Sequence, residues 1–146
     1  MAADRQTTRE ALATECAAYI TSVATGGIFD HKPDDLGGIF PAVAFEAVGS
    51  ERRRDKFTGL TSVFYFSAHL FVLYANEGQS WTKAQADDAL DALENELANF
   101  IEAKPKVTGN WNNLSFNGQT TILDNVDMGG ERYIDEIVPL RVEVYG

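Results

Sequence analysis

The spacing of hydrophobic positions near the N-terminus is helical. Thr7 and Glu10 stand three residues apart and match a capping box. Apolar residues follow at intervals of three or four: Leu12, Cys16, Tyr19 and Val23. This pattern predicts a first helix of roughly five turns. Its N-cap is expected at Thr7 and its end at the Gly26-Gly27 pair.

Alternation of apolar and polar residues replaces the helical spacing further along and predicts two adjoining strands. The first covers 41–48, and a polar connection over 49–56 follows it. The second, over 57–75, is longer than the usual strand of about 3–10 residues. We therefore expect it to bend or to project beyond the core. Its even positions are expected to face the helices: Phe64, Phe66, Ala68, Leu70, Val72 and Tyr74.

A second helix is predicted to begin at Ser80 or Thr82, either of which suits an N-cap, and to run to about Ala103. Pro105 prevents its continuation. One stripe of this helix is apolar and is expected to be buried: Ala86, Leu90, Leu93, Leu97 and Phe100 or Ile101.

The last part of the chain predicts a polar loop over 106–118 and then two strands, at 120–128 and 132–145, around Gly129-Gly130. Pro139 cannot donate a ladder hydrogen bond, so the final strand is expected to lie at an edge or to bulge there. The order is α-β-β-α-β-β. It predicts one α+β domain over 1–146, in which a mixed or antiparallel sheet carries both helices on one face.

Charged residues are distributed unequally between the two halves of the chain. The 146 residues include 12 basic and 22 acidic side chains, for a net charge of −10. Seven basic and nine acidic residues lie in 1–75, against five basic and 13 acidic residues in 76–146. The excess of acidic side chains disfavours tight binding of duplex DNA, which requires clustered lysine and arginine.

Several other classes of protein are disfavoured as well. One cysteine excludes an intramolecular disulfide and a cysteine-based zinc cluster. The most apolar stretch, 63–75, is far shorter than the roughly 20 residues of a membrane helix. The first ten residues lack the pattern of a signal peptide. We therefore expect assembly in the cytoplasm and no contact with a membrane.

For each residue that could take part in catalysis or metal binding, a structural role is the favoured interpretation. His31 lies beside three aspartates in a glycine-rich loop, and a solvated loop is favoured over a metal site. Asp87, Asp91 and Glu94 share one helix face, which favours a solvated surface over acid–base chemistry. Cys16 belongs to the apolar stripe of the first helix. No catalytic, cofactor or metal site is predicted.

A single basic cluster stands out between the two adjoining strands and is expected at the tip of their hairpin. It contains Arg52, Arg53, Arg54 and Lys56. It is either a solubilising turn or a contact with an acidic partner, such as the acidic second half of another copy. Direct DNA binding is the weaker alternative. Other candidate interface residues are aromatic or mid-strand: Tyr65, His69, Phe71 and Trp111.

The order of these patterns resembles that of a known family. A capped helix leads to a proline-containing strand, a polar hairpin and a long aromatic strand. The helix WTKAQADDALDAL at 81–93 follows, and the chain closes with the strand YIDEIVPLRVEV at 133–144. Nearly the whole chain resembles the tail terminator proteins of long-tailed, siphovirus-like bacteriophages and of gene transfer agents.

This resemblance implies a structural protein of the virion. Such a protomer assembles into a ring, usually a hexamer, which caps the tail tube, stops its polymerisation and presents a docking surface to a head-completion or neck protein. DNA passes through the channel only transiently, and the family has no catalytic residues to carry over.

Three alternatives stay open beside this one. A head-completion or head–tail connector protein belongs to the same structural class. A small binding module without a virion role would hold a ligand around Tyr65, His69 and Phe71. An enzyme would use the helix carboxylates or the surroundings of His31.

Overall fold

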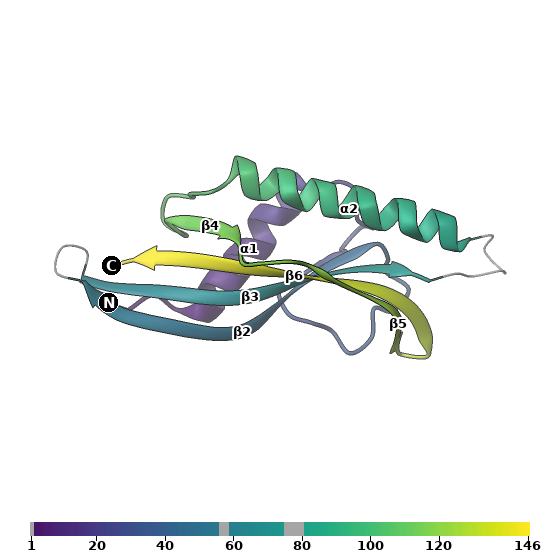
Figure 1. Ribbon diagram of the computed structural model, residues 1–146, viewed down its shortest axis with the longest axis horizontal. Helices are drawn as coiled ribbons and strands as arrows, with labels where there is room; N and C mark the ends of the chain where they lie inside the picture. Colours follow the sequence, from purple (N-terminus) through teal and green to yellow (C-terminus); the bar gives the residue numbers. More distant parts are fainter. Residues whose placement is uncertain (1, 56–58, 75–80) are drawn as a thin grey trace.

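Six strands form one sheet, and both helices lie on the same side of it (Figure 1). This computed structural model describes residues 2–55, 59–74 and 81–146. The elements are α1 (Arg5–Tyr19), β1 (Ile28–Phe29), β2 (Ala42–Asp55), β3 (Gly59–Leu73), α2 (Lys83–Ala103), β4 (Asn113–Phe116), β5 (Thr121–Met128) and β6 (Glu131–Tyr145). The predicted α+β class is confirmed, and its element order is matched with β1 and β4 as additional short strands.

The long antiparallel strands β2, β3 and β6 form the centre of the sheet. β1 pairs with β2 in parallel, and β4 and β5 both pair with the side of β6 away from β3. Because one pairing is parallel and the rest are antiparallel, the sheet is mixed. Within the described residues its two edges are unlike: β1 and β2 form one, and β4 and β5 form the other.

The main core lies between the sheet and the helices. The apolar stripe of α2 is buried as predicted: Ala86, Leu90, Leu93, Leu97, Phe100 and Ile101. The even positions of β3 belong to the same core: Phe64, Phe66, Ala68, Leu70 and Val72, with Tyr74 packed beside them. Thr82, one of the two predicted N-caps, caps α2, and Ser80, the other, lies outside the described residues. The Thr82 hydroxyl accepts from the Gln85 backbone, and the Gln85 side chain accepts from the Thr82 backbone.

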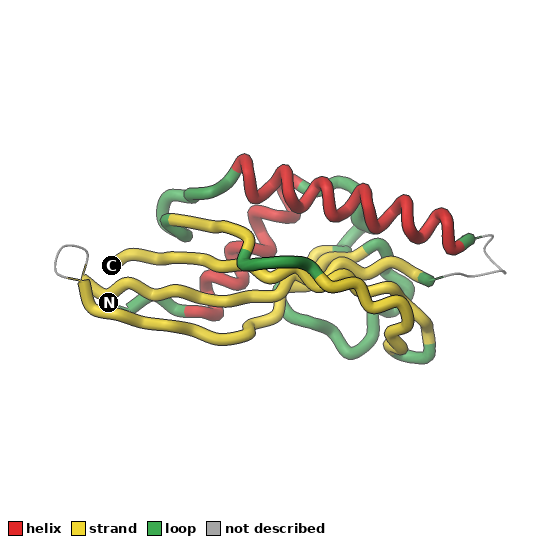
Figure 2. The backbone as a smooth tube through the Cα atoms, in the orientation of Figure 1, coloured by secondary structure: helices red, strands yellow, loops and turns green. Residues whose placement is uncertain are grey.

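A second, smaller core lies on the side of the sheet away from the helices. The segment between β1 and β2 loops around that side (Figure 2). The buried members of this core come from that segment and from four strands: Leu36, Ala42, Ala44, Phe71, Leu73, Met128 and Tyr133. This second core explains why the odd positions of β3 mix apolar with polar residues.

The first helix is shorter than predicted. Its N-cap is Asp4, whose carboxylate accepts from the Gln6 backbone N–H, while Thr7 lies inside the helix and donates to Asp4. The helix ends at Tyr19 instead of continuing to the glycine pair. The reason is a contact distant in sequence: the Glu96 carboxylate of α2 accepts from the Thr21 hydroxyl and the Ser22 N–H, each at 2.9 Å.

The first long strand extends well beyond its predicted end. β2 includes most of the segment 49–56 that was expected to be a polar connection, and pairs with β3 as far as Asp55. The register shifts between Ala47 and Gly49, which marks a bulge at Val48. Arg52, Arg53 and Arg54 are therefore strand residues and not a hairpin tip. Lys56, and the predicted ends of the following strand at 57 and 75, lie outside the described residues.

The segment 106–118, predicted to be a loop, contains the short strand β4. Together β4 and β5 flank β6, so the last strand as a whole is not an edge of the sheet, and the predicted irregularity is confined to Pro139, where the flanking strands are interrupted. Pro139 is accommodated because β4 ends opposite Leu140 and β5 begins opposite Ile137. The interruption between them faces the proline, whose carbonyl accepts from Asn117 N–H at 2.9 Å.

Candidate interaction surfaces

The outer edge of β2 is long and largely unpaired. β1 covers only Val43 and Ala44, so within the described part of the chain no strand pairs with the outer side of 45–55. Val48, at the bulge, is 65% exposed. An edge of this kind presents backbone N–H and C=O groups that another strand can pair with.

A polar groove lies where this edge meets the N-terminus of α1. It has a volume of about 540 Å³ and is lined by Asp4, Arg5, Gln6, Arg9, Ser50 and Arg52. Arg52 is held by hydrogen bonds of 2.9 Å to the Ala3 carbonyl and to the Ser62 hydroxyl, and its guanidinium lies 5.2 Å from the centre of the Phe64 ring. We call this site the arginine groove.

The arginine groove is cationic because three guanidinium groups meet there, against the one carboxylate of Asp4. Among the described residues, no carboxylate forms an ion pair with Arg5, Arg9 or Arg52. Arg5 donates to the Ser50 hydroxyl at 3.0 Å, and Arg9 Nε is buried with no hydrogen-bond partner in the part of the chain that the structure describes. The hydrogen bond from Thr7 and, to a smaller degree, the charge of Arg52 hold the pKa of Asp4 below its ordinary value.

The opposite edge of the sheet combines acidic and apolar side chains. Glu136 of β6 is only 6% exposed and accepts from the Thr120 hydroxyl at 2.7 Å. Burial raises the pKa of Glu136, and the negative charges of Glu94 and Asp91 on α2 raise it further. We call Asp91, Glu94 and Glu136 the acidic cluster. Large apolar side chains are exposed along the same edge: Phe116, Ile122 and Leu123.

A charged cluster links the three central strands, with His69 and Asp135 buried and Glu46 partly exposed. His69 of β3 is 3% exposed, and its Nδ1 lies 2.8 Å from Asp135 Oδ2 of β6, while its Nε2 lies 3.0 Å from Glu46 Oε1 of β2. Its ring stacks on Phe71 with centres 5.6 Å apart. Burial lowers the pKa of His69, but the hydrogen bond and charge of Asp135 and the hydrogen bond with Glu46 together raise it above its ordinary value.

Further polar side chains lie on the side of the sheet away from the helices, near the C-terminus. Glu143 accepts from Arg141 at 2.6 Å and from the Tyr145 hydroxyl at 3.0 Å. Burial raises the pKa of Glu143, but these two hydrogen bonds hold it below its ordinary value. Tyr65 interacts with Arg141 on the same side. Arg53 lies near Glu143, whereas Arg52 faces the helices.

The structure separates the predicted interface residues instead of gathering them. Trp111 is 2% exposed and donates through Nε1 to the Lys104 carbonyl, so it is a core residue. Phe71 belongs to the second core. Both side chains are therefore buried within the protomer, as is His69 at 3% exposed. Tyr65 is half-buried and Arg54 is exposed.

Sequence reasoning missed the residues that complete these sites. Arg5 and Arg9 are four residues apart on α1, and this spacing predicts that they share one face of the helix. It does not predict that this face lies beside Arg52. Asp135 and Glu136 alternate along β6, so one faces His69 and the other faces α2. Their burial depends on the register of β6 against β3 and β5, for which the sequence carries no local signal.

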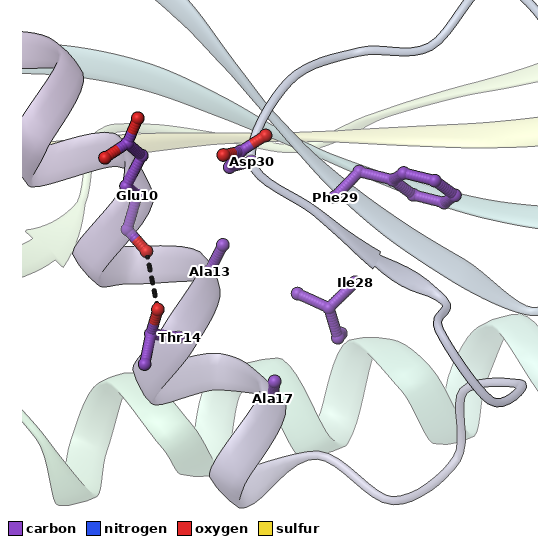
Figure 3. Close-up of a pocket in the computed structure, with 7 residues that line it drawn as sticks. All are labelled: Glu10, Ala13, Thr14, Ala17, Ile28, Phe29 and Asp30. Atoms are coloured by element: carbon purple, nitrogen blue, oxygen red, sulfur yellow. Dashed lines mark hydrogen bonds between the residues drawn. The ribbon is translucent and has the colours of Figure 1, made fainter.

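A second hollow lies on the other flank of α1, beside β1 (Figure 3). Its volume is about 480 Å³, and small residues of α1 face Ile28 across it, while the Phe29 ring points away from the helix and Glu10 and Asp30 lie at the rim. The pKa of the neighbouring Cys16 is raised by burial to about 12, which makes its thiol unreactive.

The described residues contain no group of three or more side chains placed to hold a metal ion. His31 Nδ1 lies 2.8 Å from Asp30 Oδ1 in an exposed pair. Neither α1 nor α2 is long and apolar enough to cross a membrane. In comparisons with known proteins, no family model matches the chain, and no curated protein matches it significantly.

Proposed function

We propose that the protein is a structural, ring-forming tail terminator of a phage-like particle. In this role a ring of copies, hexameric in the family that the sequence resembles, caps the tail tube and stops its polymerisation. The other side of the ring receives a head-completion or neck protein, and DNA passes through the channel. The protein works through its surfaces and has no catalytic residue.

The observation that carries this proposal is the pair of unlike edges on one sheet. Within the described residues, no strand pairs with the outer side of β2 over 45–55 and Val48 is exposed there, whereas the β4–β5 edge exposes Phe116, Ile122 and Leu123. A closed ring requires each copy to contact its neighbours through two different patches. Two unlike edges at opposite sides of one protomer supply such patches.

The charge of the chain is consistent with transient passage of DNA. The segment 76–146 carries 13 acidic and five basic side chains. A channel lined by negative charge lacks the phosphate contacts that bind DNA tightly, so DNA slides through it without being held.

Native mass spectrometry over a range of protein concentrations tests the ring. We expect a closed oligomer of defined subunit number that binds the tube protein encoded in the same genome. A monomer at every concentration, with no binding to tube protein, would overturn the proposal. Deleting the gene separates the two virion roles. Loss of a terminator leaves overlong or unjoined tails, whereas loss of a connector leaves heads that leak DNA.

A further inference from the structure

The arginine groove holds more positive charge than its own lining neutralises. Arg5, Arg9 and Arg52 line it, and Asp4 supplies the one carboxylate of the lining. The chain has 22 acidic side chains for 12 basic ones, yet the three guanidinium groups form no ion pair within the residues that the structure describes. Guanidinium groups bind carboxylates through paired, charge-assisted hydrogen bonds. The groove is therefore complementary to an anionic group of another molecule.

The hydrogen-bond donors of the groove are only partly satisfied. Arg5 donates to the Ser50 hydroxyl, which is a neutral acceptor. Arg9 Nε is buried, and nothing in the described part of the chain accepts its hydrogen bond. Buried donors without an acceptor destabilise a protein, so they are rare and point to a partner that supplies the acceptor.

The groove adjoins a strand edge that is open to another strand. Beyond Ala44, the outer side of β2 is paired with no strand of the described sheet. The register with β3 shifts before Gly49 but runs without interruption from Gly49 to Asp55, so this stretch has ordinary strand geometry. A partner segment that pairs with such an edge gains affinity from backbone hydrogen bonds.

The register shows which side chains of an added strand would reach the arginines. Ser50 lies opposite Phe64, and Arg52 lies opposite Ser62, so both point to the helical side of the sheet, where the Phe64 ring belongs to the main core. Every second side chain of a strand placed beside β2 points to that same side. Side chains of directly opposed residues are neighbours, with Cβ atoms about 4.5–5.5 Å apart. An acidic residue level with 50–52 therefore reaches the arginine groove.

We propose that the β2 edge over 49–54 binds an extended, acidic segment of a partner protein as an added strand, with a carboxylate of that segment in the arginine groove. Backbone pairing provides affinity, and the groove selects acidic sequences. This inference goes beyond the proposed function, because it names the chemistry of the segment that this edge accepts and holds whether or not copies close a ring. A nucleic-acid phosphate would fit the guanidinium groups but would leave the open backbone edge unused.

Three labelled peptides with blocked ends test the proposal by fluorescence anisotropy. In TEVEVET all glutamates share one face of an extended strand, and it is expected to bind the wild-type protein. TQVQVQT has the same pattern without charge and should bind at least about tenfold more weakly. TEPEPET keeps the charge, but its prolines cannot donate ladder hydrogen bonds, so it should not bind. These comparisons need no change in the protein, so a folding defect cannot imitate them.

A protein variant places the binding site. Arg5→Gln with Arg9→Gln should weaken binding of TEVEVET at least about tenfold. Arg52 stays unchanged because its hydrogen bonds to Ala3 and Ser62 also serve folding. The control, Lys32→Gln with Lys106→Gln, loses the same charge at exposed positions outside the groove and should bind like the wild type. Hydrogen exchange should show that TEVEVET protects backbone amides within 49–54.

Several outcomes would overturn the proposal. They are failure of TEVEVET to bind, equal binding of the glutamine or proline peptide, and an equal loss of binding in the arginine and lysine variants. A four-nucleotide single-stranded DNA, which carries the same three negative charges, tests the other occupant. If it binds more tightly than TEVEVET and depends on Arg5 and Arg9, the groove is a phosphate site and the proposal is wrong.

Assembly of copies through the same edge would make the peptide a competitor. TEVEVET should then dissociate the oligomers in native mass spectrometry, and a peptide that neither binds nor dissociates them would contradict the proposal. A wild-type chain that never assembles but binds TEVEVET as described would contradict the ring while supporting the acidic segment.

Discussion

At the scale of single residues, the most constrained polar group is His69. Both ring nitrogens face carboxylates, Asp135 at 2.8 Å and Glu46 at 3.0 Å. Because ionised carboxylates only accept hydrogen bonds, this geometry favours the doubly protonated ring. The cluster joins β2, β3 and β6 through side chains in addition to their backbone ladders, and so contributes to the rigidity of the sheet.

Replacing Asp135 by Asn is expected to lower the free energy of unfolding by about 2 kcal/mol near pH 6, because a charged hydrogen bond in a buried site is lost. The folded-state pKa of His69 lies above its ordinary value of 6.5. The stabilisation is therefore complete below the unfolded value and is lost as pH rises through the folded value.

Urea unfolding of the wild type and of Asp135→Asn at about pH 6 and at about pH 8.5 checks the direction of this pH dependence. The difference between wild type and Asp135→Asn should shrink at the higher pH, while an exposed control, Asp88→Asn, should change little at either pH. A difference that grows with pH would show that the histidine is neutral in the folded protein.

Arg52 also acts at the residue scale, because it anchors the segment before α1 to the sheet. Arg52→Gln removes the hydrogen bonds to Ala3 and Ser62 and the contact with Phe64, and should lower the unfolding free energy by about 1 kcal/mol. Arg54→Gln, two residues further along the strand, should change it by less than about 0.5 kcal/mol. Equal effects in urea titrations would contradict the anchoring role of Arg52.

At the scale of elements, the sequence pattern predicted the helix and strand ends that are determined by residues close in the sequence. The capped, amphipathic α2 and the β5–β6 hairpin around Gly129-Gly130 were predicted nearly to their observed ends. The end of α1 and the extension of β2 through 49–55 were not predicted. Contacts distant in the sequence determine both: Glu96 binds the segment after α1, and β3 pairs with the extended part of β2. The candidate sites were harder to predict than the element ends, because each site joins residues from two or three elements.

The capping box of α2 gives an element-scale test. Thr82→Ala removes the side-chain acceptor for the Gln85 N–H and should destabilise the protein by about 1 kcal/mol. Thr82→Ser retains the hydroxyl and should restore most of that loss. The comparison is made by thermal unfolding followed by circular dichroism. Equal stability of all three proteins would show that the cap is dispensable.

At the scale of the whole molecule, charge of opposite sign gathers on opposite edges of one sheet. The β2 edge holds the arginine groove, and the other edge holds the acidic cluster and exposed apolar side chains. The two charged regions are offset along the strands, because Arg52 lies level with Ser62 and Glu136 lies level with Leu70. What the proposed ring uses is therefore the unlike character of the two sheet edges, and a closed ring requires two different patches.

Because exposed arginines line the β2 edge, association of copies through this edge is expected to weaken with salt. Raising NaCl from about 0.05 M to about 0.5 M should increase the dissociation constant of the oligomer by about tenfold or more, because exposed ion pairs are screened. Sedimentation velocity at several salt concentrations measures the change. Association that strengthens with salt would indicate that the exposed apolar residues, and not the charges, hold the copies together.

The central claim is that the protein ends tail tubes, and the length of those tubes is its most direct measure. Tube protein and tape-measure protein from the same genome are assembled with and without this chain, and the tubes are measured by electron microscopy. Tubes of uniform length with a ring at one end are expected when the chain is present, and overlong tubes when it is absent. Identical length distributions, with no added density at either tube end, would contradict the central claim.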